Sequence, residues 1–197
     1  MKILVFDLDD TLYNEKSFVA SGFKAVSIFL DENQKIPQNE SFLKMLELVE
    51  LNGRGNVFDD LLKSYHIYSK SLVKKCLSVY RKHFPDIKLN YEAIKCLNRF
   101  KNYPIYIVTD GNKLVQKNKV LALEMKQFVK KIFITHNYGL DKAKPAPYCF
   151  FLIAKMELAN HEDIVYIGDN PLKDFVGIKP HGFRTIRINY TSKSVFL

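Results

Sequence analysis

The sequence contains no hydrophobic run long enough to cross a lipid bilayer, and it lacks internal repeats and low-complexity segments. A membrane-spanning helix needs about 20 consecutive apolar residues. The apolar run that begins at Ile3 is interrupted by Asp7, too early for the hydrophobic segment of a secretory signal. We therefore expect a soluble cytoplasmic protein without a membrane partner. Its 197 residues suffice for one substantial core and a small second unit.

Cysteine and histidine are too few and too scattered to indicate a zinc site. The three cysteines, Cys76, Cys96 and Cys149, lie far apart and show no CxxC spacing. We expect each to be a small buried hydrophobic side chain with a reduced thiol. The five histidines likewise show no metal-ligand spacing.

Acidic residues are fewer than basic ones, 21 against 30, which gives a net charge of +9. The excess is spread along the chain except in one stretch with Glu124 as its only acid, which contains Lys113, Lys117, Lys119, Lys126, Lys130 and Lys131. This pattern is more typical of a solvated helix face than of a nucleic-acid site, so we expect no nucleic-acid partner. A basic surface would nevertheless attract anionic substrates.

The N-terminal segment combines a buried strand with a cluster of acids. An apolar run from Ile3 to Phe6 is followed by Asp7, Asp9 and Asp10. Acids do not suit a strand buried on both faces, so they mark its carboxyl end, where ligands bind in open α/β sheets. Carboxylates this close repel one another unless a cation lies among them, which predicts Mg²⁺. An ordinary acidic turn is the alternative.

This pattern, Asp7-Leu8-Asp9-Asp10-Thr11, resembles the opening motif of the haloacid dehalogenase-like (HAD) superfamily. Three further stretches match that family in the expected order. They are Ile107-Val108-Thr109-Asp110-Gly111, Lys144-Pro145, and Ile167-Gly168-Asp169-Asn170-Pro171 with Asp174 behind it. The resemblance covers residues 3–174, almost the whole chain, and is to subfamily I with a helical C1-type cap.

The periodicity of the chain changes twice. Residues 14–89 show the spacing of four amphipathic helices, for which Ser17, Asn39 and Ser69 are candidate caps. From Leu89 onward helices alternate with strands, a short helix near Phe175 and Ile178 among them, which predicts an α/β fold with a parallel sheet between two helical layers. The resemblance implies a Rossmann-like sheet of order 5-4-1-2-3. It also implies a core domain of residues 1–13 and 90–197 with an inserted helical-bundle cap, 14–89.

The resemblance assigns the chemistry to the N-terminal acids. It implies that Asp7 is the nucleophile, forming an aspartyl-phosphate, and that Asp9 is the general acid and then the general base. The main-chain carbonyl of Asp9 would also bind Mg²⁺. For Asp10 we expect a local structural role, and we expect Thr11 to help fix the loop by hydrogen bonding. The protein would then be a Mg²⁺-dependent phosphatase of a small phosphorylated metabolite.

The later motifs supply the remaining site residues. Thr109 ends a strand, and its hydroxyl with the backbone N–H groups near Asp110 and Gly111 could hold phosphate oxygens. Many relatives have Asn where this chain has Asp110, so we expect that carboxylate to turn away. An ammonium near Asp7 would stabilise the developing charge. The family pattern favours Lys144, although Lys142 stays open.

Two further acids complete the expected metal site. Asp169 occupies the same position after its strand as Asp7 does after its own, and Asp174 would bind the metal through water or orient Lys144. We expect the cap to select the substrate, and Arg54, between two glycines, is a candidate for binding an anionic group.

Two other functions remain open from the sequence. One is a phosphomutase related to β-phosphoglucomutase, which has the same core. The other is a non-catalytic HAD-fold binding module, which the complete set of motif acids disfavours. The sequence does not specify the metabolite, and either a monomer or a homodimer is expected.

Overall fold

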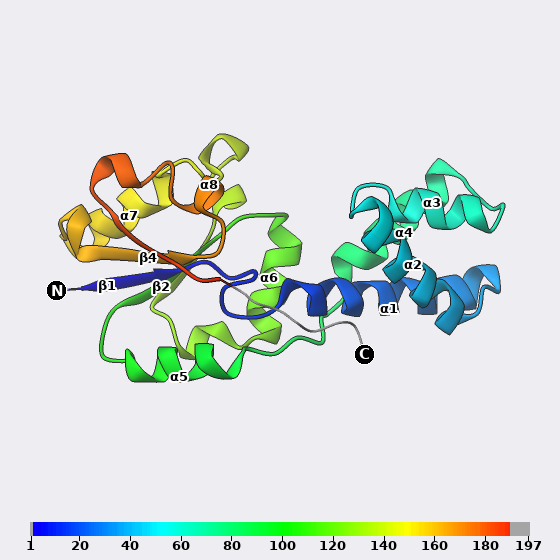
Figure 1. Cartoon of the computed structure of the whole chain (residues 1–197), viewed down its shortest axis with the longest axis horizontal. Helices are drawn as coiled ribbons and strands as arrows, with labels where there is room; N and C mark the ends of the chain where they lie inside the picture. The colour runs from blue at the N-terminus through cyan, green and yellow to red at the C-terminus, as the bar shows by residue number, and fades with distance from the viewer. Residues whose placement is uncertain (1, 190–197) are drawn as a thin grey trace. The chain divides into compact units, whose positions relative to one another are not determined.

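The computed structural model describes residues 2–189, which form two compact units (Figure 1). The α/β unit is built from Met1–Glu15 and Lys88–Leu197, and the helical unit from Lys16–Ile87. Among the described residues, no helix is both long and apolar enough to cross a membrane.

A five-stranded parallel sheet forms the centre of the α/β unit. Its strands are β1 (Ile3–Phe6), β2 (Ile105–Thr109), β3 (Lys131–Ile134), β4 (Ile164–Gly168) and β5 (Arg184–Arg187). Their order is β3-β2-β1-β4-β5, with every neighbouring pair parallel. This order is the predicted order 5-4-1-2-3 counted from the other edge of the sheet, with the N-terminal strand in the middle. The predicted α/β fold class and strand order are therefore confirmed.

The register aligns the carboxyl ends of the three central strands. Phe6 of β1 pairs with Ile107 of β2 and with Ile167 of β4. Residues that follow Phe6, Thr109 and Gly168 therefore emerge at one edge of the sheet. The motifs separated by more than 100 residues in sequence are brought together by this alignment.

Helices follow the strands as the alternating pattern predicts. They are α5 (Tyr91–Arg99), α6 (Lys113–Ala122), α7 (Tyr148–Glu157) and α8 (Pro171–Asp174), with short 3₁₀ turns between them. In Figure 1, α5 lies on one side of the sheet and α7 on the other. Cys149, Phe150 and Ile153 of α7 pack in one buried cluster with Ile3 and Val5 of β1.

The prediction of a helix near Phe175 and Ile178 was wrong in position. Helix α8 begins earlier, with Pro171 in its first turn, and ends at Asp174. Proline favours this position because its fixed φ suits a helix start and its missing N–H is not needed there. Phe175 and Ile178 are buried just beyond the helix.

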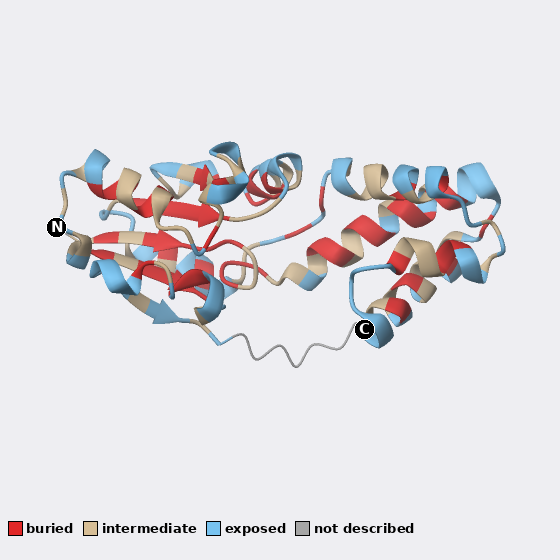
Figure 2. Ribbon diagram, turned by 90° about the horizontal axis from the view of Figure 1, so that it is seen from above, coloured by how far each residue is buried: buried red, intermediate tan, exposed pale blue. Residues whose placement is uncertain are grey.

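The helical unit contains α1 (Glu15–Gln34), α2 (Gln38–Asn52), α3 (Val57–Ser64) and α4 (Lys70–Lys82). The buried residues of α1 form a stripe along one side of the helix (Figure 2), which packs with apolar residues of the other three helices. Ser69 caps α4 as predicted, accepting a hydrogen bond from the Leu72 amide at 3.1 Å. The expected cap at Asn39 was wrong, because α2 begins after Pro37.

The three cysteines all lie in helices. Cys76 and Cys149 are buried as predicted, whereas Cys96 of α5 is only half-buried. Burial raises the pKa of the Cys76 and Cys149 thiols to about 11, so both are protonated at neutral pH.

Candidate active site

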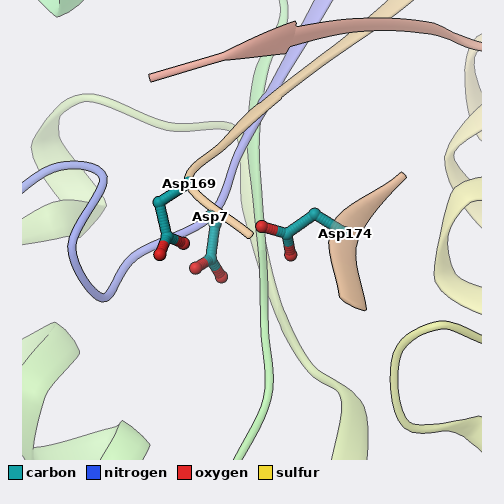
Figure 3. A group of neighbouring side chains, drawn as sticks. All are labelled: Asp7, Asp169 and Asp174. Carbon is teal, nitrogen blue, oxygen red and sulfur yellow. The ribbon is translucent and has the colours of Figure 1, made fainter. Parts of the chain in front are cut away.

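Three carboxylates converge at the carboxyl end of the sheet (Figure 3). Asp7 follows β1, and its amide donates a hydrogen bond to the carbonyl of Ile167 at 2.9 Å. Asp169 follows the neighbouring strand β4, and Asp174 comes from α8. One oxygen from each of the three acids lies within 4.8 Å of the others. The strand alignment thus gathers acids from two distant parts of the sequence.

Burial of these acids disfavours their charged forms. Burial raises the pKa of Asp7 to about 7. The Lys144 ammonium opposes this shift, and the negative charges of Asp174 and Asp9 add to it. Burial also raises the pKa of Asp169, again with repulsion from Asp174. These shifts favour protonation unless positive charge is added.

The three acids fit the expected Mg²⁺. Hard divalent cations take oxygen ligands, and Mg²⁺ is commonly bound by one or two carboxylates together with waters and substrate phosphate. A cation among Asp7, Asp169 and Asp174 would offset the repulsion that helps to raise the pKa values of Asp7 and Asp169. The Asp9 side chain lies outside this group and points to other partners, so any ligand from Asp9 would be its main-chain carbonyl.

Lys144, rather than Lys142, reaches the nucleophile candidate. Its Nζ lies 2.7 Å from Asp7 Oδ1, 2.7 Å from Asp174 Oδ1 and 2.9 Å from the hydroxyl of Tyr166. Burial opposes the charged ammonium, but Asp7, Tyr166 and Asp174 outweigh that cost and raise the pKa of Lys144. Lys142 instead pairs with Asp141 at 2.9 Å on the surface.

Asp174 is in direct contact with Lys144. Its Oδ1 accepts from Lys144 and from Tyr166, and its Oδ2 accepts from the Asn170 amide at 3.0 Å. Gly168 makes room for it, because a Cβ at that position would lie 2.5 Å from Asp174 Oδ2. Sequence reasoning missed Tyr166, which occupies an interior strand position that an apolar residue would equally fill.

The two motif threonines have buried hydroxyls. Thr109 is fully buried and Thr11 nearly so, and neither Oγ1 has a hydrogen-bond partner among the described residues. The expectation that Thr11 fixes the loop by hydrogen bonding was therefore wrong. An unpaired hydroxyl at the end of β2 fits the expected role of Thr109, because a phosphate oxygen would satisfy it.

Asp10 and Asp110 both have protein partners. Asp10 adopts a left-handed conformation (φ 50°) and accepts a hydrogen bond from the Glu15 amide at 2.8 Å, at the start of α1. Asp110 accepts from the hydroxyl of Thr135 and from the Lys144 amide, and pairs with Lys173 at 3.2 Å. Burial alone would raise the pKa of Asp110, but these contacts lower it. Its carboxylate thus supports the Lys144 loop.

Asp9 is bound by side chains that the motifs do not include. Lys119 Nζ lies 2.6 Å from Asp9 Oδ1, and Gln116 donates to Asp9 Oδ2 at 2.9 Å. The hydroxyl of Tyr13 donates to the same Oδ1. The interpretation of the lysine stretch as a solvated helix face was wrong for Lys119, whose side chain is only 2% exposed.

Arg54 belongs to the helical unit. It lies between α2 and α3 and lines a pocket of 250 Å³ whose other walls include Phe23, Phe58 and Tyr80. Gly53 beside it has a positive φ of 71°, and a Cβ added at either flanking glycine would meet nothing within 4 Å.

The fold and the site define an α/β protein with a cluster of carboxylates at the carboxyl end of its parallel sheet. A family model described as haloacid dehalogenase-like hydrolase matches residues 1–182. The chain therefore belongs to the haloacid dehalogenase-like hydrolases.

Curated relatives and solved structures cover nearly the whole chain. A glyceraldehyde 3-phosphate phosphatase of Pyrococcus furiosus is 28% identical over 96% of this chain and 81% of its own length. The protein of the same name from Methanocaldococcus jannaschii is 29% identical, over 95% and 85%. A HAD-hydrolase structure from Bacillus subtilis superposes with a TM-score of 0.66 at 22% identity, covering 98% of this chain and 89% of that one.

Proposed function

We propose that this protein is a Mg²⁺-dependent phosphatase that hydrolyses a small phosphorylated metabolite through an aspartyl-phosphate on Asp7. The contact of Lys144 with Asp7, beside Asp169 and Asp174, is the observation that carries the proposal. A buried carboxylate paired with an ammonium can attack phosphorus while neighbouring positive charge stabilises the transferring group.

In the first step an oxygen of Asp7 attacks phosphorus as the bond to the leaving oxygen breaks. The bonding electron pair stays on the leaving oxygen, and Asp9 donates its proton to it, so an alcohol departs. Lys144 lies 2.7 Å from Asp7 and stabilises the charge on the phosphoryl oxygens. The hydroxyl of Thr109 donates to one of these oxygens.

In the second step water attacks the phosphorus of the aspartyl-phosphate. Asp9, now ionised, takes the proton from that water as the bond between phosphorus and Asp7 breaks. Inorganic phosphate leaves, Asp7 returns to its carboxylate form, and Asp9 is protonated again. The two steps together consume one water and regenerate the enzyme.

The carboxylates of Asp7, Asp169 and Asp174 would hold the metal, which supplies positive charge to the phosphoryl oxygens when bound. We assign residues 14–89 to a cap that selects the substrate, with Arg54 as its anion-binding candidate. The relatives are named glyceraldehyde 3-phosphate phosphatase, which makes a triose phosphate the first substrate to test.

The test is phosphate release from glyceraldehyde 3-phosphate and from p-nitrophenyl phosphate, with Mg²⁺ and with EDTA. We expect turnover that depends on Mg²⁺ and is abolished in Asp7→Asn. Activity that survives this substitution would contradict the proposal. Turnover that requires a sugar bisphosphate activator would indicate a phosphomutase. A protein that is not phosphorylated by any of these substrates would indicate a binding module.

A further inference from the structure

The carboxylate of Asp9 has three donors among the described residues. Lys119 Nζ at 2.6 Å and the hydroxyl of Tyr13 both reach Oδ1, while Gln116 Nε2 reaches Oδ2 at 2.9 Å. A carboxylate offers about four acceptor positions, two on each oxygen. The protein therefore occupies both positions of Oδ1 and one of Oδ2.

We propose that Oδ2 of Asp9 is the atom that exchanges the catalytic proton, and that Lys119, Gln116 and Tyr13 are the positioning residues that keep it there. The inference rests on the proposed function, because it deepens the role of Asp9 in that reaction. The side chain of Asp9 is 19% exposed, and the described residues leave one acceptor position open on Oδ2, so we assign the exchange with substrate to that position.

Lys119 orients Asp9 through a buried ion pair. Its side chain is 2% exposed, and a buried ammonium is stable only with charged partners. Asp9 and Glu15 provide such partners, at 2.6 and 3.5 Å from the Lys119 Nζ. Rotation of Asp9 away from this position would leave the ammonium with weaker compensation, so the ion pair restricts the carboxylate to one orientation.

Gln116 fixes the second oxygen. Its Nε2 donates to Asp9 Oδ2 and also to the carbonyl of Asp110 at 2.7 Å, so both partners are acceptors and the orientation of the amide is determined. Gly111 leaves the space for this amide, because a Cβ there would lie 2.8 Å from Nε2. Gln116 therefore ties the loop after β1 to the end of β2.

The positioning role predicts a dependence on the leaving group. An alkoxide must receive a proton as it departs, whereas dinitrophenolate is stable without one. Misplacing Oδ2 should therefore slow phosphorylation of Asp7 by an alkyl phosphate and leave phosphorylation by 2,4-dinitrophenyl phosphate nearly unchanged. A general structural defect would slow both reactions alike.

The experiment measures the first turnover in Mg²⁺ for wild type, Lys119→Met and Tyr13→Phe. Rapid mixing follows dinitrophenolate release, and quenched flow follows alcohol release from the alkyl phosphate that wild type hydrolyses best. In Lys119→Met we expect the alkyl rate to fall by about tenfold or more and the dinitrophenyl rate to change by less than about twofold. Tyr13→Phe removes one oxygen atom. We expect it to lower the alkyl rate by less than Lys119→Met does, and again to leave the dinitrophenyl rate nearly unchanged.

Lys117→Met is the matched control, because Lys117 lies on the same helix and is exposed. We expect it to match wild type with both substrates. Equal loss with both substrates, or no loss with either, overturns the inference, and Tyr13→Phe decides it if Lys119→Met does not fold. If the wild-type protein forms no phosphoenzyme, both the proposed function and this inference are overturned. If the wild-type protein is active but the variants lose the alkyl and dinitrophenyl rates equally, the inference alone is overturned.

Discussion

Gly177 lies directly against the backbone of Pro145, the residue that follows Lys144. A Cβ at position 177 would come within 1.7 Å of the Pro145 carbonyl oxygen. This approach leaves no space for a side chain, so Gly177 maintains the position of the loop that carries the buried lysine.

Replacing Gly177 by alanine should therefore displace the Lys144 loop. We expect a stability loss of about 1–3 kcal/mol in urea unfolding, together with reduced kcat. Gly55→Ala is the control, because a Cβ there meets nothing within 4 Å. Wild-type stability and activity in Gly177→Ala would show that the close approach does not position the loop.

Lys144→Met removes the cation between two buried carboxylates. We expect kcat to fall by about 10²–10³-fold, and stability to fall by about 3–5 kcal/mol because Asp7 and Asp174 lose their partner. Lys142→Met should retain nearly full activity, since Lys142 pairs only with Asp141 among the acids of the described residues. A larger loss in Lys142→Met than in Lys144→Met would reverse this assignment.

Tyr166→Phe removes the hydroxyl that lies 2.9 Å from Lys144 and 3.1 Å from Asp174. Because Asp7 and Asp174 still hold the ammonium, we expect a loss of only about 1–2 kcal/mol in stability and a fall in kcat of less than about tenfold. Thermal unfolding and steady-state kinetics measure both effects. A loss as large as that of Lys144→Met would mean that Tyr166 acts directly in the reaction.

The raised pKa of Asp7 predicts how stability varies with pH. Its pKa is about 7 in the folded protein and about 3.8 ordinarily, so between these values the folded state retains a proton that the unfolded chain has lost. The contribution of this group to the stability of the metal-free protein therefore falls as pH rises. In EDTA, Asp7→Asn should gain Tm relative to wild type from about pH 5 to about pH 8.

Mg²⁺ should oppose this trend, because metal binding requires ionised carboxylates. We expect the metal to raise the Tm of wild type more at about pH 8 than at about pH 5, and to have little effect on Asp7→Asn. A Tm increase that is independent of pH would argue against binding at these acids.

Arg54 tests the proposed role of the helical unit. Arg54→Ala should raise KM for an anionic substrate several-fold, on the order of 1 kcal/mol, while kcat changes little. Arg81→Ala, another exposed arginine of the same unit, is the control. An unchanged KM for every accepted substrate would exclude the role.

The local sequence determined the fold class and the main site candidates. The apolar run before Asp7 and the alternation of helices and strands after Leu89 predicted the parallel sheet. Strand burial and helix amphipathicity can be predicted locally because both determine the short-range spacing of apolar residues. The acids at strand ends were recognisable because a carboxylate does not suit a buried strand. The order of the strands required the family resemblance.

Only the tertiary structure decided which distant side chains meet. Lys119 looked like one lysine of a solvated stretch, Tyr166 like a core residue, and Lys142 like an alternative to Lys144. The contacts of Lys119 with Asp9 and of Lys144 with Asp7 span 110 and 137 residues. Such contacts depend on the register of neighbouring strands and on how their loops pack, which no local sequence pattern encodes.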